Sequence, residues 1–231
     1  MNSQICRWHI YPTAQNLEIN AAHAIFRIAS QAILEHGAFS IVLAGGNTPK
    51  AIYQRLSVMP ADWRHWHVYF GDERCVPDGH AERNSSMALT SWLGHVPIPP
   101  QQIHVIPAEN GPQEGAREYC VALNPIEDFD LVLLGLGEDG HTASLFPGHE
   151  WGVEADAPAA IAVTHASKSP GNRVSLSAAR LSRARQVLFF VAGASKSAAV
   201  KSWRSGGELS ARAICPPGGV EVLADESAFG V

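Results

Sequence analysis

Cysteine is sparse in this 231-residue chain, and none of its four cysteines belongs to a Cys-x-x-Cys pair. Zinc ribbons and thioredoxin-like redox sites use such pairs, so neither is expected. Cys6, Cys75, Cys120 and Cys215 are scattered, and we interpret them as free thiols of a reducing cytosol, with two disulfides as the alternative. No metal site is predicted.

Long apolar runs and basic clusters do not occur either. No apolar segment reaches the ~18 residues of a membrane span, and the first residues lack the basic-then-apolar pattern of a secretory signal. We therefore expect a cytoplasmic protein without membrane contact. The net charge is −5, and no stripe of Lys and Arg is present, which argues against nucleic-acid binding. Small phosphorylated ligands stay possible, because they need only a few well-placed cations.

Strand-like and helix-like segments alternate along the chain, whose hydrophobic content is 46%. We predict strands at 5–11, 39–44, 66–70, 103–106, 131–134, 161–165, 173–177, 186–191 and 220–223. We predict helices at 14–35, from 48 onward, and at 84–93, 114–123, 178–182 and 196–203. The pattern indicates one α/β domain spanning 1–231, with an open, mostly parallel sheet covered by helices on both faces, as in Rossmann-like folds.

Four of the predicted strands end in polar or glycine-rich turns. These turns occupy 45–48, 71–74, 135–141 and 193–196. In an open α/β sheet the carboxyl ends of the strands meet along one edge, where ligands bind. The convergence of four such turns predicts a binding site there.

The first turn, Gly45-Gly46-Asn47-Thr48, places two glycines and a hydroxyl at the start of a helix. Backbone N–H groups and the positive end of the helix dipole make such a turn a potential anion site. It does not match the Walker A frame. The alternative is an ordinary tight turn with Thr48 as N-cap and Pro49 in the first helical position.

The third turn contains Gly-x-Gly-x-x-Gly from Gly135 to Gly140, followed directly by His141. This spacing matches a dinucleotide fingerprint, but no helix continues from the third glycine, because Pro147 interrupts the segment. NAD binding is therefore not expected. A histidine two residues after Asp139 at a strand end is instead placed to move protons, and we interpret His141 as a general base, with a purely structural histidine as the alternative.

Candidate phosphate-binding cations lie at or near the same turns. Arg74 shares a turn with Asp72, and Arg173 and Lys196 flank later strands. Arginine recognises phosphate with two donors, and lysine supplies a point charge. Other arginines have no such context and are expected to be solvated surface charges: Arg180, Arg183 and Arg185.

Taken together, these segments resemble the 6-phosphogluconolactonase family of the glucosamine-6-phosphate isomerase/lactonase superfamily. The resemblance spans nearly the whole chain and rests on the following segments: Leu43–Pro49, Gly71–Pro77 with His80 and Asn84, Gly135–Pro147, Asn172–Ser175 and Gly193–Lys196. It implies hydrolysis of 6-phospho-D-glucono-1,5-lactone, a sugar-phosphate lactone, without metal or cofactor. It also implies His141 and Asp139 as catalytic residues, and a substrate site made of Gly45, Gly46, Asn47, Thr48, Asp72, Arg74, Arg173 and Lys196.

The other branch of this superfamily deaminates glucosamine 6-phosphate and carries a glutamate five residues after the histidine. That position is Phe146 here, so the proton-transfer group of a deaminase is missing. A non-catalytic sugar-phosphate sensor is the third possibility, although Asp139 and His141 are both present. We expect a monomer or a weak homodimer.

Overall fold

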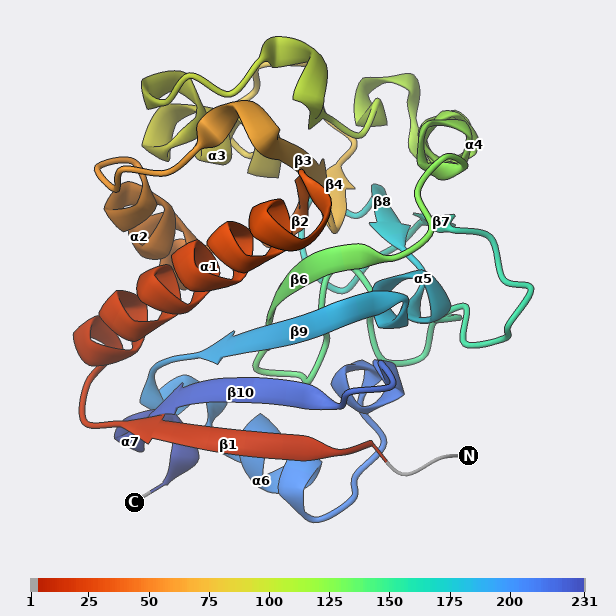
Figure 1. Cartoon of the computed structure of the whole chain (residues 1–231). Coiled ribbons are helices and arrows are strands. Elements are labelled where there is room, and N and C mark those ends of the chain that lie inside the picture. Colours follow the sequence, from red (N-terminus) through yellow and green to blue (C-terminus); the bar gives the residue numbers. More distant parts are fainter. Residues whose placement is uncertain (1–3, 231) are drawn as a thin grey trace.

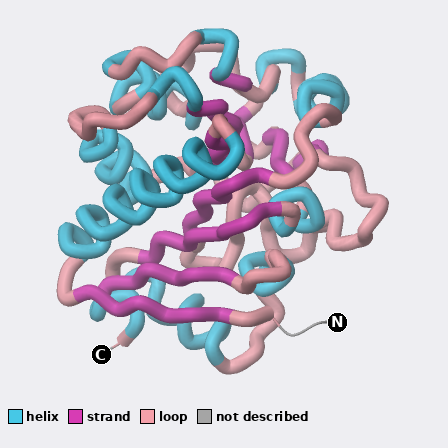
Figure 2. Tube along the Cα trace, in the orientation of Figure 1, coloured by secondary structure: helices cyan, strands magenta, loops and turns pink. Residues whose placement is uncertain are grey.

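Within residues 4–230, which the computed structural model describes, seven parallel strands form the central sheet (Figures 1 and 2). Their order is β1-β10-β9-β6-β2-β3-β5. The predicted open parallel sheet of an α/β fold is therefore confirmed. The strands are β1 (Cys6–Tyr11), β2 (Phe39–Leu43), β3 (Trp66–Phe70), β5 (Ile103–His104), β6 (Phe129–Gly135), β9 (Ala184–Val191) and β10 (Val220–Asp225).

The uninterrupted apolar runs of the sequence form the middle of this sheet. Residues Leu131–Leu134 of β6 are all buried, as are the last three residues of both β2 and β3. A fully buried Leu, Val or Phe side chain stabilises the fold by ~1.5–3 kcal/mol, so strands of this composition belong at the centre. Their carboxyl ends carry the turns discussed below.

Helices cover both faces of the sheet. Helix α1 (Ala14–His36) lies across one face; Thr13 caps its start by accepting a hydrogen bond from the Asn16 N–H at 3.1 Å, and Gly37 ends it with φ 85°. On the opposite face, Trp203 of α6 (Ser197–Arg204) packs edge-on against Trp8 and Phe189. The other helices are α2 (Asn47–Leu56), α3 (Asn84–Ser91), α4 (Pro112–Leu123), α5 (Ala178–Ser182) and α7 (Glu226–Phe229).

A second, antiparallel sheet has the order β4-β8-β7 and differs from expectation. Its strands are β4 (Asp72–Arg74), β7 (Ala160–Val163) and β8 (Arg173–Leu176). The segment 71–74, predicted as a turn, is thus mostly a short strand, because its backbone pairs with β8. Asp72 lies opposite Ser175 and Arg74 opposite Arg173 in this pairing. The strand predicted to run to His165 ends at Val163, and His165 has φ 55°.

The prediction that Arg180 is a solvated surface charge is wrong. It is buried, and its guanidinium carbon lies 3.9 Å from the centre of the Phe129 ring. Burial lowers its pKa to about 10. The hydrocarbon stem and the planar guanidinium let arginine pack against an aromatic ring in this way.

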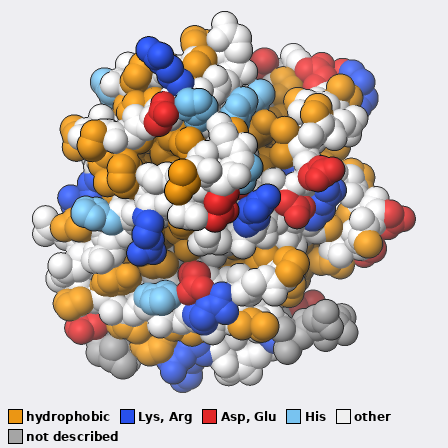
Figure 3. Space-filling model, viewed as in Figure 1, with side chains coloured by type: hydrophobic (Ala, Val, Ile, Leu, Met, Phe, Trp, Pro, Cys, Tyr) orange, Lys and Arg blue, Asp and Glu red, His pale blue; other side chains and the backbone are white. Residues whose placement is uncertain are grey.

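Other sequence-based expectations concern the whole surface. No helix among residues 4–230 is long and apolar enough to cross a membrane. The four cysteines are free. On the face visible in Figure 3, acidic and basic side chains are interspersed and do not gather into a stripe of one sign.

Candidate active site

A cleft of about 250 Å³ lies at the carboxyl ends of the central strands, where the four turns were predicted to converge. Of the predicted site residues it is lined by Gly45, Gly46, Asp72, Arg74, His141, Arg173 and Lys196. Asn47, Thr48 and Asp139 do not line it directly. The lining also includes Asn84 and Lys168, which were not among the predicted site residues.

The glycine turn after β2 forms one wall of the cleft. A Cβ on Gly45 would lie 2.1 Å from Oδ1 of Asn84, so only glycine allows α3 to approach this closely. Gly46 has φ 102° and is the N-cap of α2, which corrects the predicted N-cap at Thr48. The helix begins at Asn47 because a left-handed glycine, rather than a side-chain cap, ends the turn. Within residues 4–230, the start of α2 has no side-chain cap hydrogen bond.

The turn after β6 closes on itself and holds His141. The Gly137 N–H donates to the His141 carbonyl oxygen at 2.7 Å. The Thr142 hydroxyl donates to the Gly135 carbonyl oxygen at 2.8 Å, and the Thr142 N–H donates to Ser210 Oγ at 3.0 Å. These bonds fix the backbone on both sides of the imidazole.

His141 and Asp139 form a hydrogen-bonded pair through Nδ1 and Oδ1. Because Nδ1 donates to a carboxylate, Nε2 is the unprotonated nitrogen of the neutral ring. Burial lowers the pKa of His141, against the opposing effect of Asp139. Burial alone would raise the pKa of Asp139, but the hydrogen bonds and charge of His141 and the charge of Lys168 together outweigh it, and the pKa is lowered. A neutral imidazole oriented by an ionised acid is the arrangement of a general base.

Phe146 backs the imidazole at the far end of this loop. Its ring is fully buried and lies 4.4 Å from the His141 ring, at an interplanar angle of 31°. The position therefore supplies packing and no proton-transfer group. It also contributes to the low polarity around His141.

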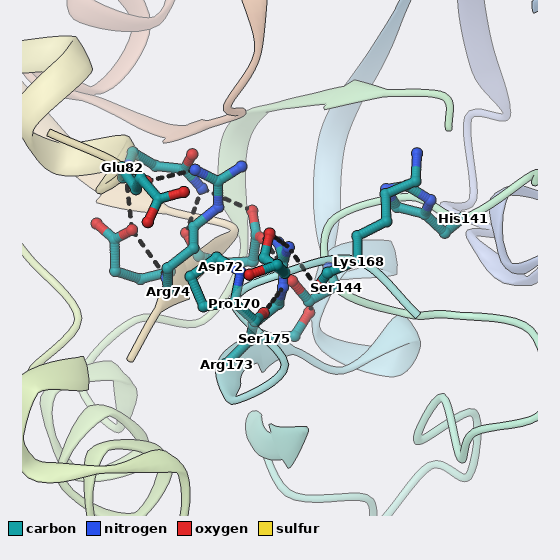
Figure 4. A network of polar contacts seen from close by, with 12 residues as sticks. Asp72, Arg74, Glu82, His141, Ser144, Lys168, Pro170, Arg173 and Ser175 are labelled. Carbon is teal, nitrogen blue, oxygen red and sulfur yellow. Dashed lines mark hydrogen bonds and ion pairs between the residues drawn. The ribbon is translucent and has the colours of Figure 1, made fainter. Parts of the chain in front are cut away.

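Asp72 lies in a buried polar network on the cleft floor (Figure 4). Asn84 Nδ2 donates to its Oδ1 at 3.0 Å, and Ser144 Oγ donates to its Oδ2 at 2.6 Å. Ser144 thus donates to a carboxylate and has no histidine partner among the described residues, unlike the nucleophile of a serine hydrolase. Asn84 and Ser144 were not predicted as site residues, and their only signal was their position inside the quoted motifs.

Glu73, the neighbour of Asp72, faces away from the cleft. Its buried carboxylate accepts hydrogen bonds from the backbone N–H groups of Arg74, Asn84 and Ser85 at 2.7–2.9 Å. It therefore stabilises the start of α3, where a negative charge is favoured. This places the Asn84 amide beside Asp72.

Arg173 lines the cleft, and its guanidinium already has partners within the protein. Its role as a phosphate-binding cation stays a prediction. Its Nε donates to the Pro170 carbonyl oxygen at 3.0 Å, and its Nη2 donates to those of Lys168 and Ser169 at 3.2 and 3.3 Å. Nη1 lies 3.9 Å from Oδ2 of Asp72. Because its guanidinium points toward its own loop, Arg173 is buried and not solvated.

Lysines supply the accessible positive charge. Lys196 lies in the 3₁₀ turn Ala194–Lys196 after β9, which is anchored because the Gly193 N–H donates to both carboxylate oxygens of Asp225 at 3.1 Å. Lys168 is exposed on the loop before β8, and its side chain extends toward His141 (Figure 4). Arg74 is also at the cleft, where its Nη1 donates to the Glu82 carbonyl oxygen.

No group of three or more His, Cys, Asp or Glu side chains among the described residues is arranged to hold a metal ion. The site is built from an acid–histidine pair, a glycine-lined helix start and several cations. Such a set can bind a small anionic molecule and activate a water molecule beside it.

Comparison with known proteins gives a consistent result. Residues 12–223 match the family model described as glucosamine-6-phosphate isomerases/6-phosphogluconolactonase. The chain is 40% identical over 176 residues to a 6-phosphogluconolactonase of Synechocystis, covering 72% of each chain. It is 35% identical over 225 residues to one of Streptomyces coelicolor, covering 89% of this chain and 85% of the relative. The solved structure of 6-phosphogluconolactonase from Trypanosoma brucei superposes with a TM-score of 0.89, at 27% identity and 99% coverage of both chains.

Proposed function

Because the chain belongs to the glucosamine-6-phosphate isomerase/6-phosphogluconolactonase family, we propose that it hydrolyses 6-phospho-D-glucono-1,5-lactone to 6-phospho-D-gluconate with His141 as the general base. The observation that carries this proposal is the His141–Asp139 pair at the mouth of the strand-end cleft. The lowered pKa of His141 supports it, because burial keeps the imidazole neutral and able to accept a proton near pH 7.

The phosphate end of the substrate is assigned to the wall made by Gly45, Gly46 and the start of α2. The amides of Asn47 and Thr48 and the helix dipole favour an anion there. Lys196 and Lys168 add two charges from neighbouring elements, and Arg74 adds a third at the edge of the cleft. Asn47 and Thr48 are still predicted to bind the substrate, through backbone or side-chain groups.

In the proposed reaction, Nε2 of His141 removes a proton from water, and the resulting hydroxide adds to C1 of the lactone. The carbonyl electrons move to the exocyclic oxygen, whose negative charge the N–H groups of the glycine turn stabilise. When the carbonyl reforms, the C1–ring oxygen bond breaks, and protonated His141 returns its proton to that oxygen. Asp139 orients the ring and stabilises its charged form. Help of this kind is worth ~10²–10⁴-fold in rate.

Phe146 favours the lactonase over the deaminase reaction. A buried apolar ring 4.4 Å from His141 supplies no acid or base for opening an amino sugar. Lactone hydrolysis needs only one proton carrier, which His141 provides. The sensor alternative gains no support, because His141 lines the cleft and its hydrogen-bonded partner Asp139 is present beside it.

The test is lactone turnover with the lactone generated in situ. We expect wild-type protein to accelerate its loss, and His141→Ala to reduce kcat by ~10²–10⁴-fold. His23→Ala, an exposed histidine away from the cleft, is the matched control. Near-wild-type activity in His141→Ala would exclude His141 as the base. Ammonia release from glucosamine 6-phosphate would support a deaminase, and thermal stabilisation by 6-phosphogluconate without turnover would support a sensor.

The wider assignments remain proposals. The reaction would be the second step of the oxidative pentose phosphate pathway, and it uses water and the sugar-phosphate lactone alone. The four free thiols support a reducing compartment such as the cytosol. One domain over 1–231 and a monomer or weak homodimer stay predictions.

A further inference from the structure

Arg173 is the most connected side chain of the cleft, yet the chemistry proposed above gives it no role. It is 4% exposed, and its guanidinium contacts three different parts of the site. Nε and Nη2 bind three successive carbonyl oxygens of residues 168–170, as described above. Nη1 faces Asp72, and the guanidinium carbon lies 5.3 Å from the centre of the Phe146 ring.

These contacts leave little capacity for a phosphate. Arginine has five N–H donors in a fixed fork, and the Nε and Nη2 sides of Arg173 already face the loop. Asp72 lies 3.9 Å from Nη1, so a phosphate approaching that side would meet a buried carboxylate. Repulsion between two anions at low polarity disfavours such binding.

The same contacts connect Arg173 with two groups that do face the substrate. The loop carbonyls that it holds belong to Lys168 and the next two residues, so the fork fixes the backbone from which the Lys168 side chain extends toward His141 (Figure 4). Its Phe146 contact lies directly behind the imidazole, since Phe146 packs 4.4 Å from His141.

We propose that Arg173 is a positioning residue that acts through Lys168: it holds the loop 168–170 so that the Lys168 ammonium group stands at the cleft as a substrate-binding cation beside His141. The inference rests on the proposed function for the identity of the substrate. It assigns phosphate contact to Lys168 and removes it from Arg173. Asp72, itself held by Asn84 and Ser144, fixes the opposite side of the guanidinium.

The test compares Arg173→Lys, Lys168→Met and the double variant. Arg173→Lys keeps the charge but loses the fork that holds three carbonyls. Lys168→Met is expected to raise KM about tenfold, the usual effect of losing a hydrogen bond to a charged group. If Arg173 acts through Lys168, Arg173→Lys raises KM to a similar extent and the double variant is no worse than either single one. Independent roles would multiply the effects to about a hundredfold, which would overturn the proposal.

A pH profile distinguishes positioning from a general loss of stability. The charged groups acting on His141 are Asp139, Asp72 and Lys168, and the positive charge of Lys168 lowers its pKa. Lys168→Met should therefore move the acid limb of kcat/KM to higher pH. Arg173→Lys should move it in the same direction, although it removes no charge. An unmoved limb in Arg173→Lys beside a moved one in Lys168→Met would contradict the proposal.

The chain offers matched controls. Arg180 is also buried, also lies over an aromatic ring and also binds backbone carbonyl oxygens, but it does not line the cleft. Arg180→Lys should lower the melting temperature without changing KM or the pH profile. Lys201→Met, an exposed lysine of α6, controls for loss of a charge.

Failure of this inference and failure of the proposed function give different results. If the wild type does not hydrolyse the lactone, the function fails. NMR titration of the His141 imidazole in wild type, Arg173→Lys and Lys168→Met then still tests positioning without any substrate. A raised His141 pKa in both variants supports it, and a raised pKa in Lys168→Met alone overturns it.

Discussion

Gly137 and His141 are hydrogen-bonded through their backbones, and the His141 imidazole occupies the space that a side chain on Gly137 would need. The Gly137 N–H donates to the His141 carbonyl oxygen, and a Cβ on Gly137 would lie 2.1 Å from Nδ1 of the imidazole. The His141 imidazole and the Asp139 carboxylate therefore both lie close to the α-carbon of Gly137. The requirement is one of space, since no side chain at this position could coexist with the Asp139–His141 bond.

Gly137→Ala is predicted to displace the imidazole while leaving the fold intact. The added methyl group would also lie 2.5 Å from Oδ1 of Asp139, so the pair must separate. We expect kcat to fall by ~10²-fold or more, the range of a lost general base. Steady-state kinetics and a thermal melt check this, with Gly218→Ala, where a Cβ meets nothing closer than 3.6 Å, as control. Unchanged kcat in a folded variant would refute the placement of His141.

Asp139→Asn is predicted to lower the rate and move the pH profile. The carboxylate raises the pKa of His141 against the effect of burial, so its loss lowers that pKa further. The acid limb of kcat/KM should move to lower pH. Rates should fall by up to ~10⁴-fold, as in triads whose acid is made neutral. Measuring kcat/KM between pH 5 and 9 tests this prediction. An acid limb that moves to higher pH would contradict the pairing of Asp139 with His141.

Ser144→Ala separates a structural hydroxyl from a nucleophile. The Ser144 hydroxyl is fully buried and donates to Asp72 at 2.6 Å. Its removal leaves a buried carboxylate oxygen short of a donor, at a cost of ~1–3 kcal/mol in the free energy of unfolding. Urea denaturation measures this, beside Ser205→Ala on the surface. Activity should stay within about tenfold of wild type, and complete loss from a folded variant would indicate covalent catalysis.

Two histidines outside the cleft predict how stability depends on pH. The rings of His67 on β3 and His104 on β5 are stacked, with centroids 6.1 Å apart. Burial lowers both pKa values below the ordinary 6.5, and repulsion by His67 adds to the effect at His104. The unfolded chain therefore binds more protons near pH 6, so the free energy of unfolding should decrease as the pH falls below about 6.5.

The double variant His67→Asn/His104→Asn tests that dependence. Denaturant titrations at pH 7.5 and 5.5 should give a smaller difference in the variant than in the wild type. His141 contributes in the same direction in both proteins, because its pKa is also lowered. An equal pH dependence in the two proteins would show that these rings do not contribute.

The parts of the fold that the sequence predicts well are those set by local patterns. The run Leu131–Leu134 has no alternation and becomes a strand buried on both faces. Gly37 ends α1 as expected, because a left-handed residue terminates a helix. The convergence of four turns at one cleft follows from the parallel order of the strands alone.

What the sequence could not predict depends on contacts between distant segments. The strand pairing of Asp72–Arg74 with Arg173–Leu176 leaves no trace in either segment by itself. Lys168 lies in a polar loop without periodicity, and the hydrogen bond from Arg173 to its carbonyl oxygen is not evident from the sequence. Arg180 was misjudged for the same reason, because a buried and a solvated arginine look alike in sequence.

The pairing of β1 with β10 has a consequence for synthesis of the protein. β1 is an edge strand whose sheet partner is Val220–Asp225, so contacts such as Arg7–Glu221 span 214 residues. On the ribosome, β1 has no partner strand until β10 leaves the exit tunnel. Asp225, which anchors the turn of Lys196, is the last residue of β10 and leaves the tunnel with it. The turn of Lys196 therefore lacks its anchor until Asp225 has been synthesised, and a nascent chain stalled before residue 220 would hold His141 beside an unanchored Lys196 turn.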